Sequence, residues 1–383
     1  MDVLDRVRGC LLGGAIGDAL GAPIEFQSLR TIRRDHGPDG ITGYVTTWRG
    51  RTGLITDDTQ MTLFTVEGLL TARAAAPTTG PTTGPTTASA AAPTTGPTAG
   101  LTAVSQGHGS GERAEGRDGA REETVGAVRR AYLRWLDTQE HSGPPPASPL
   151  PHRTGRLREE GWLYSRRAPG NACLSGLHRP FPGPVWDGPG PVNPDSKGCG
   201  TVMRSAPFGL VAGTPLARDT REAFELAAAC AQITHGHPTG YLAAGAFAAI
   251  IARLMSGEPL EPAVGHALDL LSGYPGHDET TAALRAALAL AARGGHSPEA
   301  VESLGGAWVA EEALAIGVYC ALAEPAVDRA LLLSVNHSGD SDSTGSVCGN
   351  LLGALHGTSV LPAAWLRPLE GRDTIERLAA ELA

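Results

Sequence analysis

Residues 335–357 read V-N-H-S-G-D-S-D-S-T-G-S-V-C-G-N-L-L-G-A-L-H-G. Asp340 and Asp342 lie two positions apart in a turn rich in serine and glycine, and from Gly345 onward a glycine recurs at every fourth position. A spacing of four places these glycines on one face of a helix, where a second helix can approach closely. The stretch therefore predicts a polar loop that brings carboxylates to the N-terminus of a closely packed helix.

The same turn carries three hydroxyl groups, on Ser341, Ser343 and Thr344. Carboxylates and hydroxyls together, without nitrogen or sulfur ligands, suit a hard cation such as Mg²⁺ or Mn²⁺. An EF-hand loop would close with a glutamate at the position that holds Leu351, so a calcium loop of that kind is excluded. A plain capping turn is the alternative for this stretch taken alone.

A second acidic turn, I-T-D-D-T-Q-M, occupies residues 55–61. Thr56 is expected to be an N-cap, with Asp57 and Asp58 in the first turn of a helix that runs to about Ala72. A helix N-terminus stabilises anions, which would explain the two aspartates without any ligand. Adjacent carboxylates repel each other unless a cation neutralises them, however, so the pattern favours a metal site.

The segment 3–22 reads as a helix in which glycine again recurs at every fourth position, starting at Gly9. Each glycine inside a helix costs about 1 kcal/mol relative to alanine, so close packing has to offset the loss. We expect this helix to contact the helix at 344–356 through the two glycine faces. Asp18 lies inside the first helix and needs a polar partner there, and Glu25 follows in an irregular segment.

Composition limits the class of protein. The chain has 383 residues, a net charge of −9 and only 5% aromatic residues, which argues against a binder of nucleic acid or membrane surfaces and favours close-packed helices over a sheet. The six cysteines form no C-x-x-C pair, so reduced thiols are expected rather than disulfides or a zinc site. The apolar N-terminal stretch fits neither a signal peptide nor a spanning helix. We expect a cytoplasmic, monomeric protein.

The rest of the chain extends this pattern. Repeats of P-T-T-G mark a low-complexity, disordered insertion at about 74–122 within a single domain of residues 1–383. A helix follows at 124–139, and residues 140–200 are irregular. The later sequence predicts helices only, at 220–233, 239–255, 261–273, 279–293, 298–304, 309–323 and 326–334. Since no strand pattern appears, the fold class is all-α.

Two further motifs carry polar groups. The turn S-K-G-C-G-T-V-M-R-S at 196–205 opens a helix whose free N–H groups could hold a phosphate. It matches no phosphate-loop motif, however, and taken alone it is better explained as a surface turn. In I-T-H-G-H-P, at 233–238, His235 and His237 lie near a helix start, where one cap and one ligand-facing imidazole are expected rather than a metal-binding pair.

Six motifs stand in order along the chain: G-A-I-G-D-A-L-G-A-P-I-E-F, I-T-D-D-T-Q-M, R-R-A-P-G-N-A-C, S-K-G-C-G-T-V-M-R-S-A-P, I-T-H-G-H-P and G-D-S-D-S-T-G. This set resembles the ADP-ribosylglycohydrolases, the family of dinitrogenase-reductase-activating glycohydrolase and ADP-ribosylarginine hydrolase. The resemblance covers nearly all of the chain outside the insertion. It implies a compact, single-domain helical fold with a central cleft that holds two Mg²⁺ or Mn²⁺ ions.

The resemblance also implies roles for individual residues. The metal ligands would be Thr56, Asp57, Asp58, Asp340, Asp342 and Ser343. The catalytic groups would be among Glu25, Asp57, Asp58 and Asp342. The diphosphate and the distal ribose or adenine would lie against Gly198, Cys199, Gly200, Met203 and His235, while Asn171 and Cys173 align only loosely. Some relatives have asparagine in place of Cys199. In one branch of the family another acidic residue, in a loop after the helix of the second acidic turn, serves as catalytic base; the insertion obscures its counterpart here, and Asp137 is the candidate.

The activity that the resemblance implies is hydrolysis of the N-glycosidic bond between ADP-ribose and an arginine guanidinium of a modified protein. The wording G-D-S-D-S-T-G is closer to arginine-directed members than to those that act on serine. Hydrolysis of O-linked ADP-ribose, on serine or in O-acetyl-ADP-ribose, is an alternative. So are binding of ADP-ribose without turnover, a structural role as in the lens, and immunity against an ADP-ribosylating toxin. Six intact coordinating oxygens argue against a purely structural or binding role.

Overall fold

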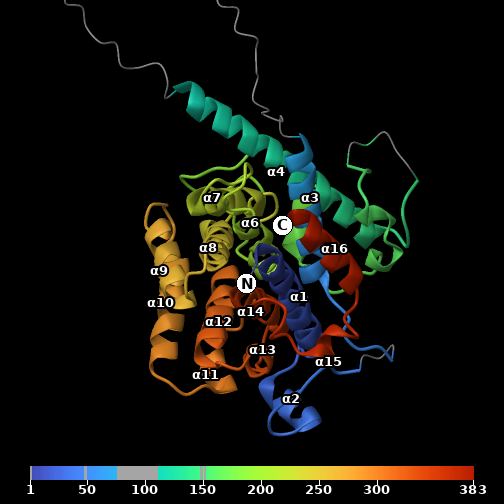
Figure 1. Ribbon diagram of the computed structural model, residues 1–383, viewed down its shortest axis with the longest axis vertical. Coiled ribbons are helices and arrows are strands. Elements are labelled where there is room, and N and C mark those ends of the chain that lie inside the picture. Colours follow the sequence, from blue (N-terminus) through green and yellow to red (C-terminus); the bar gives the residue numbers. More distant parts are fainter. Residues whose placement is uncertain (1, 47–49, 76–110, 147–149, 151) are drawn as a thin grey trace, which may run out of the picture.

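The regular secondary structure of the described residues consists of helices (Figure 1). The computed structural model describes residues 2–46, 50–75, 111–146, 150 and 152–383. The α-helices in that part are α1 (Val3–Gly21), α2 (Leu29–His36), α3 (Asp57–Ala75), α4 (Gly111–Glu140), α5 (Asn171–Leu177), α6 (Ala206–Leu210), α7 (Thr220–Ala231), α8 (Pro238–Met255), α9 (Leu260–Leu271), α10 (Asp278–Ala292), α11 (Pro298–Glu302), α12 (Ala310–Ala323), α13 (Val327–Val335), α14 (Ser341–His356), α15 (Ala363–Leu366) and α16 (Arg372–Leu382). Short 3₁₀ helices are η1 (Leu157–Glu159), η2 (Gly161–Leu163) and η3 (Cys199–Arg204). Only isolated β-bridges occur in these ranges, which confirms the all-α prediction.

Two helices from opposite ends of the chain, α1 and α14, lie side by side in the middle of the protein (Figure 1). A Cβ atom on Gly13 would collide with the backbone of Gly349, and one on Gly17 with the backbone of Gly345. The predicted contact through glycine faces is therefore confirmed. The helix α14 begins at Ser341, three residues before the predicted Thr344, because the side chain of Asp340 caps it.

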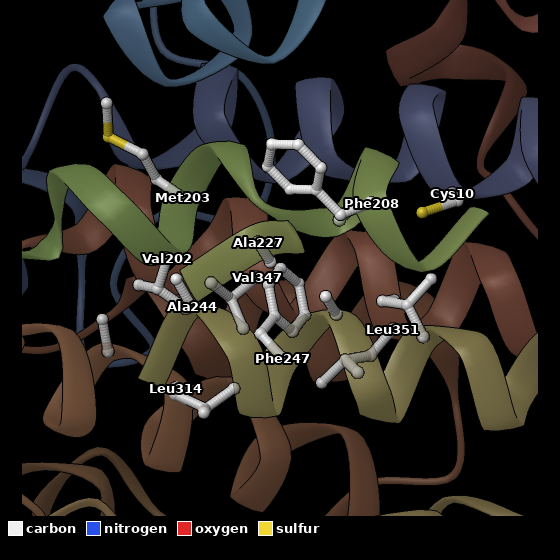
Figure 2. Packing of buried hydrophobic residues seen from close by; sticks show 14 of the residues in the cluster. Cys10, Val202, Met203, Phe208, Ala227, Ala244, Phe247, Leu314, Val347 and Leu351 are labelled. Atoms are coloured by element: carbon white, nitrogen blue, oxygen red, sulfur yellow. The ribbon is translucent and has the colours of Figure 1, made fainter. Parts of the chain in front are cut away.

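The hydrophobic core lies where α8 meets α12 and α14. Figure 2 shows Phe247 and Ala244 of α8 close to Leu314 of α12 and Val347 of α14, and all four are buried. By length and composition α8 alone, among the described helices, could cross a membrane, but 83% of it is buried inside the protein. That burial is expected of a core helix in a globular fold.

The long helix α4 corrects one boundary of the predicted insertion. It begins at Gly111, so residues 111–122 are helical rather than disordered. Glutamate, arginine and alanine are frequent there and favour helix, so the segment extends the helix expected at 124–139. The remainder of the predicted insertion, residues 76–110, lies outside the described residues, while its first two residues end α3.

The helices predicted beyond residue 215 are all present, as α7 to α13, with ends that differ by a few residues. The six cysteines are free, as expected from their spacing. Their sulfur atoms are mostly buried among apolar side chains, where thiols pack as small hydrophobic groups.

Candidate metal and substrate site

The two acidic turns of the sequence meet at one cavity of about 410 Å³. Asp57 and Asp58 reach it from the start of α3, and Asp340 and Asp342 from the start of α14. Glu25, in the turn that follows α1, lies on the same wall. The convergence of these turns, which are far apart in the chain, is the main expectation of the sequence and is confirmed.

The tightest group of carboxylates consists of Glu25, Asp340 and Asp342. One oxygen atom from each lies within 4.8 Å of the others, and all three side chains are buried. Divalent cations bind protein oxygens at about 2.0–2.6 Å, so oxygens at this separation can share one ion. The resemblance gave Glu25 a catalytic role only, whereas the structure places it in the same cluster as two predicted ligands.

The start of α3 is held in place by Asp18 of α1. The Asp18 carboxylate accepts hydrogen bonds from the backbone N–H of Thr56 at 3.0 Å and of Thr59 at 3.1 Å, and from the Thr59 hydroxyl at 2.5 Å. Asp18 is fully buried, so these donors supply the partner that its position in a helix requires. The turn with Asp57 and Asp58 is thereby fixed relative to α1 and to its neighbour α14.

Local hydrogen bonds set the direction of the two aspartates at α14. Asp340 is the N-cap, and its Oδ1 atom accepts from the N–H of Ser343 at 3.2 Å. The Oδ1 atom of Asp342 accepts from the same N–H at 2.9 Å. Because α3 and α14 both begin at the cavity, two helix N-termini lie beside this concentration of negative charge and stabilise it in part.

Burial and mutual repulsion raise the pKa values of the clustered carboxyl groups. The pKa of Glu25 rises to about 9 because the side chain is buried and faces Asp340 and Asp57. Burial holds the pKa values of Asp57, Asp58 and Asp342 well above their ordinary range, and neighbouring negative charges add to the effect. Without a counter-charge, the site therefore favours partial protonation.

The chemistry of the cavity fits a divalent cation. The Oδ2 atom of Asp58 is buried and has no hydrogen-bond partner in the described part of the chain, an arrangement that is costly unless a ligand satisfies the oxygen. Carboxylates together with the hydroxyl of Ser343 form an oxygen-only donor set, as Mg²⁺ and Mn²⁺ prefer. The lining of the cavity therefore suits a divalent cation, while the individual metal ligands stay predictions.

Thr56 is the exception among the predicted ligands. It lines a neighbouring cavity of about 450 Å³, which shares Glu25, Phe26 and Ala168 with the carboxylate cavity. Its Oγ1 atom accepts a 3.3 Å hydrogen bond from the N–H of Asp58, as expected for the residue that caps α3. Capping is the role that the contacts of Thr56 support directly, and its role as a metal ligand stays a prediction.

The glycine-rich segment 196–205 forms part of the cavity wall, so the surface turn expected from its sequence alone is wrong. The wall residues that it supplies are Gly198, Cys199, Gly200 and Met203. The segment is held by backbone pairing with the residues before α12: Cys199 N–H donates to the carbonyl of Trp308 at 3.3 Å, and Ala310 N–H to that of Lys197 at 2.9 Å. This tertiary pairing is absent from the local sequence pattern.

The two histidines before α8 separate as expected. His237 is the N-cap, and its Nδ1 atom accepts from the N–H of Thr239 at 3.2 Å. His235 lies on the cavity wall beside the glycine-rich segment and is almost fully buried. The predicted cap is confirmed, whereas contact of the His235 imidazole with a ligand stays a prediction.

A loop with Ala168 closes another side of the cavity and is anchored by its neighbour Arg167. The Arg167 guanidinium pairs with the buried carboxylate of Glu370 and donates to the carbonyl oxygen of Ile55 at 2.5 Å. Ala168 adopts a positive φ of 51°, a conformation that alanine rarely takes and that tertiary contacts must hold. The anchor therefore maintains the loop against its own backbone preference.

Two aromatic rings at the cavity were not found from the sequence. Phe26 and Trp308 stack with ring centroids 5.6 Å apart and an angle of 20° between the planes, and both line the cavity. They are 71% and 46% exposed, which is unusual for large apolar side chains. The only signal in the sequence is the scarcity of aromatic residues, which makes each of them conspicuous.

The loosely assigned residues have mixed outcomes. Asp137 does not line the cavity: its buried carboxylate pairs with Arg153 at 3.2 Å, so the suggestion of a catalytic base there is wrong. Asn171 does line the cavity. Cys173 lies behind the wall, where its thiol donates to the carbonyl oxygen of Gly200 at 3.8 Å.

Comparisons with known proteins agree with this architecture. A sequence model described as ADP-ribosylglycohydrolase matches residues 1–383. An uncharacterized protein of Archaeoglobus fulgidus is 25% identical over 388 residues, which cover 99% of this chain and 96% of that protein. ADP-ribosylarginine hydrolase Tri1 of Pseudomonas putida is 23% identical over 379 residues, which cover 99% of this chain and 78% of the relative.

A solved structure described as an ADP-ribosylglycohydrolase-related protein complex has a similar fold, with a TM-score of 0.55 and 22% identity, over 99% of this chain and 97% of that one. The resemblance noted in the six sequence motifs is thereby confirmed. Because the family model matches from the first residue to the last, this chain belongs to the ADP-ribosylglycohydrolase family.

Proposed function

We propose that this chain removes ADP-ribose from modified arginine side chains by hydrolysing the N-glycosidic bond to the guanidinium, with two Mg²⁺ or Mn²⁺ ions in the carboxylate cavity. The observation that carries the proposal is the cavity itself, where five buried carboxylates face a glycine-rich wall. Family membership adds the class of reaction. The relative named ADP-ribosylarginine hydrolase supports the arginine linkage.

The residues proposed to hold the ions are Thr56, Asp57, Asp58, Asp340, Asp342 and Ser343. Glu25 joins them because its carboxylate lies in the tightest acidic group. When bound, divalent cations would neutralise the clustered charge, fix the hydroxyl groups of the scissile ribose and lower the pKa of the attacking water.

The protein's own groups perform the remaining tasks. A carboxylate of Glu25, Asp57 or Asp58 accepts the proton of the attacking water as positive charge develops at the anomeric carbon. Gly198 and Gly200 contribute positions without side chains to the wall, where the diphosphate can approach the backbone closely. His235 is proposed to bind the distal part of ADP-ribose.

A direct assay tests the proposal. The protein is incubated with Mg²⁺ or Mn²⁺ and with three substrates, which carry ADP-ribose on arginine, on serine or as O-acetyl-ADP-ribose. We expect release of free ADP-ribose from the arginine substrate, and Asp340→Ala should reduce the rate about a hundredfold or more. Asp328→Ala, at an exposed position of α13, is the matched control and should retain activity.

The other substrates decide between the remaining classes of function. Turnover of the serine or O-acetyl substrate without the arginine substrate would assign an O-linked hydrolase. Tight binding of ADP-ribose without turnover of any substrate would assign a binding protein, and would contradict the proposed hydrolysis.

A further inference from the structure

Behind the cavity wall lies a buried cation that forms an ion pair with no carboxylate of the described residues. Arg204, at the end of η3, is only 1% exposed, and none of the ion pairs among the described residues includes it. Its guanidinium lies 4.4 Å from the centroid of the Tyr132 ring. One nitrogen is 3.3 Å from the sulfur of Met61 and 3.4 Å from that of Cys173. The charge of Arg204 is therefore surrounded by uncharged, polarizable groups.

The other terminal nitrogen of Arg204 donates to the hydroxyl oxygen of Thr234 at 2.6 Å. The same hydroxyl lies 2.8 Å from Nδ1 of His235 and 3.4 Å from the carbonyl oxygen of Ala231. All three side chains are buried. Arg204, Thr234 and His235 thus form a continuous chain of hydrogen bonds from the buried cation to the cavity wall.

The positions of the protons in this chain follow from donor and acceptor chemistry. A guanidinium only donates, so the Thr234 oxygen must accept from Arg204. The hydroxyl proton then goes to His235 Nδ1, which at 2.8 Å is a closer acceptor than the carbonyl at 3.4 Å. A proton on Nδ1 would instead leave the Thr234 hydroxyl with only the long contact. The imidazole therefore carries its proton on Nε2.

The Nε2 edge of the His235 imidazole, opposite the edge that faces Thr234, lies against the glycine-rich wall. A Cβ atom added to Gly198 would lie 3.3 Å from Nε2 of His235, and one added to Gly200 would lie 3.4 Å from it. Both glycines line the cavity, and none of the described residues pairs with Nε2. Burial and the charge of Arg204 lower the pKa of His235 to about 3, so the ring stays neutral at physiological pH.

We propose that Arg204 and Thr234 are positioning residues that hold His235 in its neutral Nε2–H form, so that the imidazole donates a hydrogen bond to an acceptor oxygen of the bound ligand. The inference rests on the proposed function only for the identity of that ligand, a ribose hydroxyl or a diphosphate oxygen of ADP-ribose. The buried charge of Arg204 also makes the wall favourable for a negatively charged ligand.

The test uses Thr234→Val, which keeps the shape of the side chain and removes the hydroxyl, and Thr234→Ser, which restores a hydroxyl. Thr280→Val is the matched control, since the Thr280 hydroxyl is buried, has no hydrogen-bond partner among the described residues and lies on α10. The readout is the long-range proton–nitrogen NMR correlation of ¹⁵N-histidine-labelled protein, with His235→Gln to identify the signal of His235.

We expect the Nε2–H pattern in the wild type, in Thr234→Ser and in Thr280→Val, and a loss of that pattern in Thr234→Val. With Mg²⁺ present, calorimetry should show ADP-ribose binding about tenfold more weakly to Thr234→Val. KM should rise by a similar factor while kcat changes less than about twofold.

An Nδ1–H pattern in the wild type would overturn the proposal, and so would unchanged NMR and affinity in Thr234→Val. The NMR measurement needs no substrate, so it decides the role of Arg204 and Thr234 separately. If the wild type shows the Nε2–H pattern but fails to bind ADP-ribose, the proposed function fails and the positioning of His235 stands.

Discussion

The carboxylate of Asp18 accepts hydrogen bonds at 3.0 Å from the backbone N–H of Thr56, the residue that caps α3. Asp18 stands on α1 between two glycines that pack against α14. The packed pair of helices α1 and α14 therefore positions both acidic turns. Asp340 and Asp342 lie at the start of α14 itself, and Asp18 of α1 holds the start of α3 beside them.

Asp18→Asn tests this connection. An amide offers one acceptor oxygen in place of two and turns an N–H group toward backbone donors. We expect the free energy of unfolding to fall by about 1–3 kcal/mol and the affinity for Mn²⁺ to fall as well, measured by urea denaturation and by calorimetry. Asp269→Asn, at an exposed position of α9, should change neither quantity. Unaltered Mn²⁺ binding in Asp18→Asn would show that the α3 turn is positioned by other contacts.

The glycine contact between α1 and α14 predicts that a glycine-to-alanine substitution lowers the free energy of unfolding at Gly13 but raises it at Gly265, which lies outside the contact. Gly13→Ala would force a methyl group into the backbone of Gly349, so we expect a loss of about 1–3 kcal/mol or more. Gly265→Ala on α9, where an added Cβ meets nothing within 4 Å, should stabilise the protein by up to about 1 kcal/mol. Thermal and urea unfolding of both variants measure the difference. Equal effects at the two positions would contradict close packing of α1 on α14.

The raised carboxyl pKa values predict that Mg²⁺ binds more tightly as the pH rises. The pKa of Glu25 is about 9 in the fold, against an ordinary value of 4.5. The protonated form is therefore favoured, and its contribution to stability is present below pH 4.5 and is lost as the pH rises through about 9. Metal binding requires the ionised form and so releases protons.

We accordingly expect the melting temperature without metal to fall between pH 6 and pH 9, and the increase caused by Mg²⁺ to grow over the same range. Thermal unfolding with and without Mg²⁺ at several pH values is the measurement. Asp58→Asn removes one repelling charge and should make the fall in the metal-free protein shallower. A stabilisation by Mg²⁺ that is independent of pH would count against binding at this cluster.

The pair of Arg167 with Glu370 predicts how the loop at Ala168 is held. Glu370→Gln removes the charge that the largely buried guanidinium faces, so we expect a loss of about 2–3 kcal/mol and a higher KM. Glu376→Gln breaks an exposed pair with Arg372, whose side chains are 36% and 40% exposed, and should cost about 0.5 kcal/mol or less. Urea unfolding and steady-state kinetics compare the two variants, and similar losses in both would refute the anchoring role.

Short-range patterns made much of this protein predictable. Glycines at every fourth position predicted the contact of α1 with α14 because helix periodicity alone puts them on one face. Adjacent aspartates behind Thr56 predicted an acidic helix start, because capping and charge repulsion act over a few residues. The same local reasoning failed for the segment 196–205, whose place in the wall depends on pairing with residues before α12.

The sequence by itself determined the helical class, the two glycine faces and the chemistry of the acidic turns, since these depend on periodicity, propensity and charge along the chain. Only the tertiary structure decided that Glu25 joins Asp340 and Asp342, that Asp18 serves α3, and that Arg204 reaches His235 through Thr234. Each of these relations joins segments distant in sequence, and their geometry is fixed by the packing of whole helices rather than by any local preference.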